Sequence, residues 1–464
     1  MKRRDFIKLS LATTGAAILA PTYSYGVPLD MSTISFSEEK YTNNAAQTII
    51  LFLYGGPSQL GGNLSNIEEI KQYSESSYGS HFPYITPSTN QCWEEAGGVD
   101  MEALMASGDM TLYRTCYSLE QERTNNKAHG VCTEQIQKGV YDIDSGSGGI
   151  VANIATILEA KGMVNSSTLL PFVTITGESE AEQGGAFYQD RNTPLAGYLK
   201  PVGIDANFSN PYKREVRGHQ YYYTQEEKDA NPNYNGSDEV GGMDPQLIED
   251  MKVLSQSHIK NTKIKNAFIN REHISNFIDT VRQEATPTLD HPYPNSPFSS
   301  TIEAAIKILD SNPDTKVITI GSAGLGGWDD HNDARNYVSR HRELFASLRS
   351  AIDHLKAIQK EGSINIMVFG EFGRNVNLNG ANGWDHGNLQ NVYVLGGKNY
   401  FTHRGVVGET VVHGQESGRV WLKPKVGTYW FDPMSIAATL YSIYGIENPN
   451  VLTSGDFAPL NVVS

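Results

Sequence analysis

Cysteine is scarce in this chain of 464 residues, and long apolar runs are missing. Because Cys92, Cys116 and Cys132 are an odd number, they exclude a closed disulfide framework, and their spacing is not a zinc pattern. A single Cys116–Cys132 bridge is the pairing that we consider. Beyond the N-terminus no uncharged segment approaches the about 20 residues that a spanning helix needs. We therefore expect no transmembrane segment in the mature chain.

Positive charge is also in deficit, with 37 Lys and Arg against 52 Asp and Glu and a formal net charge of −15. Phosphate contacts need clustered Lys and Arg, and no run here supplies them, so we expect no nucleic-acid partner. The 39% hydrophobic and 19% charged residues are typical of a globular protein and exclude a disordered chain.

The N-terminus resembles a twin-arginine export signal. Paired arginines, Arg3 and Arg4, lie in a basic region that is followed by a short, weakly apolar stretch from residue 9 to residue 20. Ser24 and Gly26 flank Tyr25 as a cleavage pattern. The sequence therefore predicts a signal peptide at 1–26, a linker at 27–46, and export of the folded protein to the periplasm or the extracellular space.

Continuous apolar runs recur along the chain and predict buried, mostly parallel strands. They lie at residues 48–54, 169–176, 316–320, 364–369 and 391–395. An apolar stripe from Tyr337 to Ile358 predicts a long helix, capped by Asn332 or Asp330 and ended by Gly362. This alternation predicts an α/β fold with a doubly wound, mostly parallel sheet flanked by helices. We expect one domain at 47–464 with a loop-rich insertion at about 178–245.

Carboxylate and imidazole side chains gather beside the predicted strand ends. Asp329 and His331 follow the strand at 316–320, and Asp385 and His386 precede the strand at 391–395. A single Asp-His pair is more often a surface turn or a helix cap. Two pairs, both preceded by Gly-Trp and both beside strands, favour a site for a divalent metal such as Zn, Mn, Mg or Ca.

Five motifs together resemble a known family. They are Arg3-Arg4-Asp5-Phe6, Leu53-Tyr-Gly-Gly-Pro-Ser58, Gly326-Gly-Trp-Asp-Asp-His331, Glu371-Phe-Gly-Arg374 and Asp385-His-Gly387. The set is similar to exported bacterial proteins of domain-of-unknown-function family fifteen-oh-one, placed in the alkaline-phosphatase and sulfatase-like superfamily. The resemblance implies a sulfatase-like sheet with a bimetallic site for phosphate or sulfate esters.

The resemblance also implies roles for individual residues. It maps metal ligation onto Asp385 and His386, with Asp329 and His331 as a further set and Glu371 counted among the candidate ligands. The superfamily nucleophile sits at the start of a helix, and the matching stretch here runs from residue 124 to residue 130, before a helix at 131–138. Thr124 is its candidate nucleophile, and His129 is a candidate ligand or base.

Three departures from the superfamily pattern keep a second function open. The first strand ends at Tyr54-Gly55-Gly56 where a metal-binding Asp is usual, Gly61-Gly62 stand where similar members carry an acid, and the Cys-x-Pro-x-Arg element is absent. One carboxylate fewer would hold an ion less tightly. The sequence is compatible with a metal-dependent hydrolase of small-molecule esters, or with a degenerate scaffold that binds an envelope or secreted protein partner.

Four other polar residues have competing interpretations. Arg374 could clamp an anionic ester oxygen or pair with Glu371 or Asp385. Ser58 could be a nucleophile, but a turn followed by a helix cap is favoured. His341 and His354 lie on the predicted long helix, where packing is favoured over metal ligation.

Overall fold

A computed structural model describes residues 29–175, 185–191, 195–208, 253, 262–321, 324–416, 419–453 and 455–460. The chain divides into two compact units. The larger comprises residues 26–165, 170–207 and 285–464, and the smaller comprises residues 1–25, 166–169 and 208–284. The signal peptide expected at 1–26 and most of the insertion expected at 178–245 lie outside the described residues.

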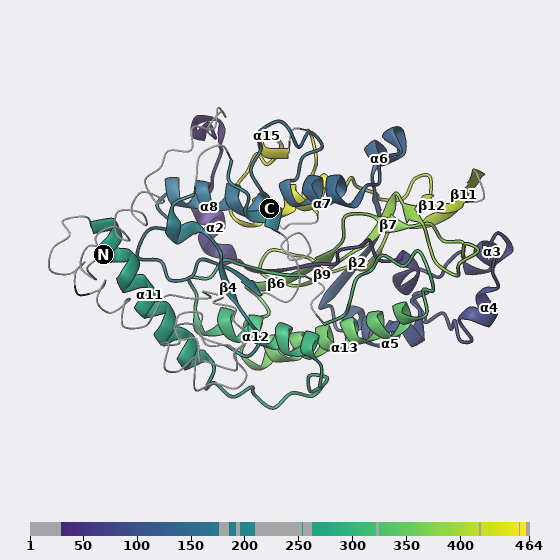
Figure 1. Ribbon diagram of the computed structural model, residues 1–464, viewed down its shortest axis with the longest axis horizontal. Coiled ribbons are helices and arrows are strands. Elements are labelled where there is room, and N and C mark those ends of the chain that lie inside the picture. The colour runs from purple at the N-terminus through teal and green to yellow at the C-terminus, as the bar shows by residue number, and fades with distance from the viewer. Residues whose placement is uncertain are drawn as a thin grey trace, which may run out of the picture. The chain divides into compact units, whose positions relative to one another are not determined.

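An eight-stranded sheet forms the centre of the larger unit (Figure 1). Its spatial order is β10 (Gly405–Val407), β2 (Met110–Tyr117), β9 (Leu389–Gly396), β6 (Ile364–Phe369), β1 (Gln47–Phe52), β5 (Val317–Ile320), β3 (Phe172–Ile175) and β4 (Val202–Ile204). Only β9 runs antiparallel to its neighbours in this sheet. The carboxyl ends of seven strands and the amino end of β9 therefore meet at one edge, which confirms the mostly parallel α/β sheet.

Burial on both faces explains why the central strands β1 and β6 consist mostly of apolar residues. All six residues of β1 and all six of β6 are buried, and Ile49 of β1 pairs with Ile366 of β6 and with Ile318 of β5. A strand covered on both faces needs apolar side chains in both directions, and this produces continuous runs instead of alternation. These two strands are thus fixed by their own sequences.

Helices cover both faces of the sheet. In Figure 1 α12 (Pro297–Ser311), α13 (Asn336–Ala357) and α5 (Gly98–Ala106) pack together below the strands. On the opposite face lie α2 (Glu38–Asn44), α7 (His129–Lys138), α8 (Ile150–Ala160) and α14 (Met434–Ile443), with α14 in contact with the other three. The doubly wound arrangement predicted from the sequence is confirmed.

The long helix α13 forms where the apolar stripe predicts it, but its ends differ. Neither Asn332 nor Asp330 caps it, because Asp330 instead accepts a hydrogen bond from Arg340. The helix ends at Ala357, five residues before Gly362, and Ile358 closes its last turn. His341 and His354 are buried on it, and the His341 ring donates from Nδ1 to the carbonyl of Ala96 at 2.6 Å. Both histidines are packed residues.

Shorter elements complete the described chain. They are η1 (Met31–Thr33), η2 (Gln59–Gly62), α3 (Ile67–Gln72), α4 (Tyr78–His81), η3 (Glu94–Ala96), α6 (Leu119–Thr124), η4 (Gly185–Tyr188), η5 (Gly197–Leu199), the paired β7 (Gly373–Arg374) and β8 (His386–Gly387), the hairpin β11 (Thr410–Glu416) and β12 (Arg419–Pro424), and α15 (Asn450–Thr453). The smaller unit contains α11 (Thr262–Val281).

The structure differs from the sequence-based expectations at the cysteines and in the segment before β1. The Cys116–Cys132 bridge is wrong, because all three cysteines are free and buried. The segment expected as a linker at 27–46 holds η1 and α2 in its described part, and an isolated bridge joins Phe36 to Ile446. No helix among the described residues is long and apolar enough to cross a membrane.

Candidate metal centre

Four side chains from three distant segments meet at the carboxyl edge of the sheet. His129 is the first residue of α7, which follows β2; Asp329 and His331 lie in the loop after β5; and His386 lies in β8, just before β9. We call these four residues the His/Asp cluster. Open α/β sheets place their binding sites at this edge, and the residues just before β9 reach it because β9 runs in the opposite direction.

Three imidazole nitrogens surround one carboxylate oxygen. The Nε2 atoms of the three histidines lie 3.3 Å (His129), 3.2 Å (His331) and 3.6 Å (His386) from Oδ1 of Asp329. The Nε2 atoms of His331 and His386 are 2.9 Å apart. All four potential ligand atoms lie within 4.8 Å of one another.

These separations fit a single bound ion. Four ligands at about 2.0–2.1 Å from a tetrahedral Zn²⁺ lie about 3.3 Å from one another, close to the distances around Asp329. The Nε2 atom of His129 is buried and makes no hydrogen bond within the described chain, which is costly unless another partner takes its lone pair. The donor set and its geometry therefore fit a divalent metal.

Two carboxylates lie behind the histidines instead of among the converging atoms. Glu371 Oε1 is 2.7 Å from Nδ1 of His129, and Asp385 Oδ1 is 3.2 Å from Nδ1 of His331. Each carboxylate accepts the proton of Nδ1, which leaves Nε2 of that ring as the ligand atom. Asp385 and Glu371 are expected from the sequence as direct ligands, and in the structure each contacts the Nδ1 atom of a histidine, His331 and His129 respectively.

A glycine backbone replaces the expected carboxylate at the end of the first strand. Gly55 has a φ of +109°, and a Cβ there would come within 2.5 Å of the backbone nitrogen of Asp329. Its N–H donates to Glu371 Oε1 at 2.9 Å, and its carbonyl accepts from Arg374. Position 55 therefore braces two site residues through its main chain, and no side chain fits there.

Arg374 is fully buried and fixes Asp329. Its Nη2 donates to Asp329 Oδ1 at 2.6 Å, its Nε donates to the carbonyl of Gly56 at 2.7 Å, and its Nη1 donates to the carbonyl of Trp384 at 3.0 Å. The side chain has no exposed surface. Neither of the pairings expected from the sequence, with Glu371 or with Asp385, is formed, and the guanidinium has no open face to clamp a substrate anion.

The local charges shift the pKa values of three cluster residues in different directions. Burial, followed by the charges of Arg374 and the other two cluster histidines, lowers the pKa of His386 to about 4, so this ring is neutral at pH 7. Burial opposes ionisation of Asp329, but the Arg374 guanidinium holds the pKa of this carboxyl below its ordinary value. At His129 burial disfavours the charge, yet Glu371 and Asp329 outweigh it and raise the pKa.

The Thr124 hydroxyl is engaged within its own helix. The residue ends α6, is exposed, and donates from its hydroxyl to the carbonyl of Glu120 in its own helix at 2.7 Å. Ser58 is buried and caps η2 with its side chain, as the favoured interpretation predicts. The role of nucleophile thus gains no geometric support at either hydroxyl.

Sequence reasoning gave no role to Arg419, which contacts one of the two carboxylates behind the histidines. Arg419 begins β12, and its Nε lies 3.0 Å from Oδ2 of Asp385. It is a lone basic residue in sequence, so only the three-dimensional contact reveals its position.

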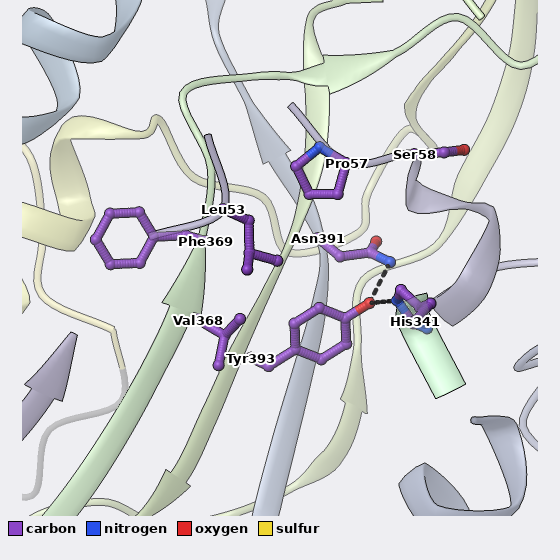
Figure 2. Close-up of a pocket in the computed structure, with 8 residues that line it drawn as sticks. All are labelled: Leu53, Pro57, Ser58, His341, Val368, Phe369, Asn391 and Tyr393. Carbon is purple, nitrogen blue, oxygen red and sulfur yellow. Dashed lines mark hydrogen bonds between the residues drawn. The ribbon is translucent and has the colours of Figure 1, made fainter. Parts of the chain in front are cut away.

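A small cavity lies under the loop that follows β1 (Figure 2). Tyr393 links Asn391 and His341 in its lining, with its hydroxyl 3.1 Å from Asn391 Nδ2 and 3.4 Å from His341 Nε2. The lining contains none of the four residues of the His/Asp cluster. The candidate metal centre and this cavity are therefore separate features.

Comparison with known proteins supports the family resemblance. Residues 270–420, which contain Asp329, His331, Asp385 and His386, match the family described as "Protein of unknown function (DUF1501)". The matched family is the one that the motifs resemble. No curated protein matches the chain significantly.

Among solved structures, the chain is similar to the lipoteichoic acid synthase LtaP from Listeria monocytogenes and to the phosphonate monoester hydrolase SpPMH from Silicibacter pomeroyi. For LtaP the identity is 9%, with 90% of this chain and 77% of that chain covered, at a TM-score of 0.34. For SpPMH the identity is 13%, with 89% and 75% covered, also at 0.34. The proposals that follow rest on site geometry, because function resides in the site and not in overall likeness.

Proposed function

We propose that this protein is a metal-dependent hydrolase of phosphate or sulfate esters. The observation that carries the proposal is the approach of three imidazole nitrogens to Asp329 Oδ1 at 3.2–3.6 Å. Histidine-rich sets suit Zn²⁺ and other transition metals, whereas Mg²⁺ and Ca²⁺ prefer oxygen ligands. Of the metals considered, Zn therefore fits better than Mn, Mg and Ca.

The chain's own residues would prepare such a site in defined ways. His129, Asp329, His331 and His386 would hold the ion, while Glu371, Asp385 and Arg374 fix three of these ligands in place. A divalent ion held there would polarise an ester oxygen and neutralise charge that develops on it.

The open side of the cluster is accessible to substrate. The Asp329 side chain is 46% exposed and that of His331 is 36% exposed, whereas Glu371 behind them has no exposed surface. Because Thr124 is engaged with its own helix, the geometry favours water over a side-chain hydroxyl as the attacking group.

We further propose that the protein works outside the cytoplasm. The support is the paired arginines and the short apolar stretch after them, which are typical of the twin-arginine route. This route carries folded proteins, so a metal could be taken up before export.

A second candidate function is a metal-braced scaffold without turnover. Two observations favour it: the Thr124 hydroxyl is hydrogen-bonded within its own helix, and Gly55 supplies no carboxylate at the end of β1. Such a protein would use its ion to hold the loops of the carboxyl edge together for an envelope or secreted partner.

Metal analysis combined with a panel of substrates distinguishes the hydrolase from the scaffold. We expect about one ion per chain and hydrolysis of at least one class among aryl phosphate monoesters, diesters and sulfates. His386→Gln should lose both properties, whereas His413→Gln, a change of an exposed histidine on β11, should keep both. A wild type that binds metal but turns over nothing in the panel supports the scaffold, and one that binds no metal contradicts both functions.

A further inference from the structure

The three histidines of the His/Asp cluster are not held in the same way. Glu371 contacts Nδ1 of His129 at 2.7 Å, and Asp385 contacts Nδ1 of His331 at 3.2 Å. The Nδ1 atom of His386 has no hydrogen-bond partner within the described chain, although its Nε2 lies among the converging atoms. Histidines that bind a metal almost always donate their other nitrogen to a hydrogen-bond acceptor, which fixes the ring. Within the described chain, the His386 ring must therefore be oriented by packing.

Phe372 packs against the His386 ring. The two ring centroids are 4.5 Å apart, and the ring planes meet at an angle of 41°. The same phenyl ring lies 4.9 Å from the ring of His129, and the imidazoles of His129 and His386 are 4.5 Å apart in an edge-to-face arrangement. Aromatic rings attract one another when their centroids are about 4.5–7 Å apart. One apolar side chain therefore contacts two of the candidate metal ligands.

The Phe372 ring itself has little freedom to move. The residue is 1% exposed. A Cβ at Gly56 would come within 2.5 Å of Phe372 Cδ2, so the ring lies directly against the backbone of Gly56. The Arg374 guanidinium lies over the ring, with its Cζ 5.9 Å from the ring centroid. These contacts fix the plane of the ring that the two imidazoles meet.

The pairing of two short strands brings Phe372 to His386. Strand β7 pairs with β8 in antiparallel fashion, and Arg374 of β7 lies opposite His386. Gly373, the first residue of β7, packs so closely that a Cβ there would overlap the carbonyl oxygen of Leu389. Phe372 immediately precedes β7, so this pairing carries it to the histidine. The contact between the two rings thus follows from a defined strand register.

We infer that Phe372 is a positioning residue, which holds the His386 imidazole in the orientation that a bound metal requires. It does for His386 what a carboxylate does for each of the other two histidines, through ring contact instead of a hydrogen bond. An apolar ring brings no charge, so it acts on the direction of the Nε2 lone pair and not on its basicity. This inference rests on the metal site of the proposed function and adds to it a residue of the Glu371-Phe-Gly-Arg374 motif.

The test replaces Phe372 by Met, which fills a similar space with a flexible chain and removes the ring plane. Phe345→Met is the matched control, because Phe345 is fully buried and packs on His341, a histidine outside the cluster, at a centroid distance of 5.0 Å. Each variant thus loses one phenyl ring that contacts an imidazole. Competition with a chromophoric chelator should show Zn²⁺ binding weakened about tenfold in Phe372→Met and unchanged in Phe345→Met.

A second measurement uses Co²⁺ in place of Zn²⁺, because the visible absorption of Co²⁺ reports the arrangement of its ligands. Phe372→Met should change these bands, whereas Phe345→Met should leave them as in the wild type even where it lowers stability. Wild-type Zn²⁺ affinity and an unchanged Co²⁺ spectrum in folded Phe372→Met would overturn the inference, and so would equal losses in Phe345→Met.

Crystal structures distinguish failure of this inference from failure of the proposed function. A wild type that takes up no metal contradicts the proposed function, and metal-free crystals then decide the inference. The His386 ring should keep one orientation in the wild type and lose it in Phe372→Met, and the same ordered orientation in both would overturn the inference. Phe372→Leu replaces the Met variant if the latter does not fold. A wild-type crystal structure with the phenyl ring out of contact with His386 overturns the inference without any variant.

Discussion

Replacing Glu371 by Gln tests whether a buried carboxylate prepares His129 for metal binding. The side chain keeps its size, but the charge behind His129 disappears. Glu371 is fully buried and Oε1 serves two donors, the Gly55 N–H at 2.9 Å and His129 Nδ1 at 2.7 Å. Its other oxygen makes no hydrogen bond within the described chain, so the new amide group would enter a place without an acceptor for it.

These contacts set the loss of metal affinity that we expect for Glu371→Gln. Loss of a carboxylate behind a metal-bound histidine costs about 10–100-fold in metal affinity, or about 1.4–2.7 kcal/mol. Asp385→Asn makes the same change behind His331, but the Asp385 side chain is 24% exposed and water screens its charge. We therefore expect a smaller loss there than for Glu371→Gln.

In the metal-free protein, the contact between His129 and Glu371 should make the free energy of unfolding depend on pH. Because the pKa of His129 is raised in the folded protein, its stabilisation is fully present below the unfolded pKa of about 6.5 and is lost as the pH rises through the folded pKa. The difference in unfolding free energy between wild type and Glu371→Gln should therefore be larger at pH 6 than well above pH 7.

Competition with a chromophoric chelator gives the metal affinity, and urea unfolding of the apo protein gives the stability. Glu68→Gln is the control, because Glu68 is an exposed carboxylate on α3. If Glu371→Gln binds Zn²⁺ as tightly as wild type while it remains folded, Glu371 does not position His129, and our account of the cluster is wrong.

Three further predictions address residues with other roles. Arg374→Met should cost at least about 3 kcal/mol in urea unfolding, since it leaves several buried carbonyls without a donor; a clamp for substrate would instead raise KM and leave stability unchanged. Burial raises the pKa of Asp432 to about 6, so folding loses free energy as the pH rises from about 4 to 6. Asp432→Asn should remove this dependence and stabilise the protein by about 1–3 kcal/mol at pH 7, as urea titrations at pH 4.5 and pH 7 would show. Replacing Arg3 and Arg4 by Lys keeps the charge but should retain the folded protein in the cytoplasm, and normal accumulation outside it in cell fractionation would contradict the twin-arginine assignment.

The sheet was predictable wherever burial on both faces leaves an apolar run. β6 coincides with its predicted bounds, and β1 differs by one residue at its start and by two at its end. β2 was not predicted, because Thr111, Arg114 and Thr115 interrupt its apolar residues. Arg114 is nevertheless buried, since its Nε donates to the carbonyl of Gly62 at 2.7 Å. Partners that distant in sequence leave no local pattern.

In the candidate site, too, local patterns were predictable and contacts between distant residues were not. The Gly-Trp-Asp contexts and the strand ends locate Asp329, His331 and His386 at one edge, and the structure brings them together with His129. Whether a carboxylate points at the ion or at the back of an imidazole depends on side-chain direction. Composition cannot distinguish these positions, so the sequence does not predict that Asp385 and Glu371 contact the Nδ1 atoms of His331 and His129.

The antiparallel direction of β9 has a consequence for how the centre comes into existence. His129, at the start of α7, and His386, in β8, are separated by more than 250 residues, although the main-sheet strands before and after them, β2 and β9, pair with each other. Closing so long a loop in an unfolded chain is entropically costly, so partly folded chains cannot bring the four donors together. An ion therefore binds here only after the sheet has formed. Its binding free energy stabilises the fully folded unit and not partly folded chains.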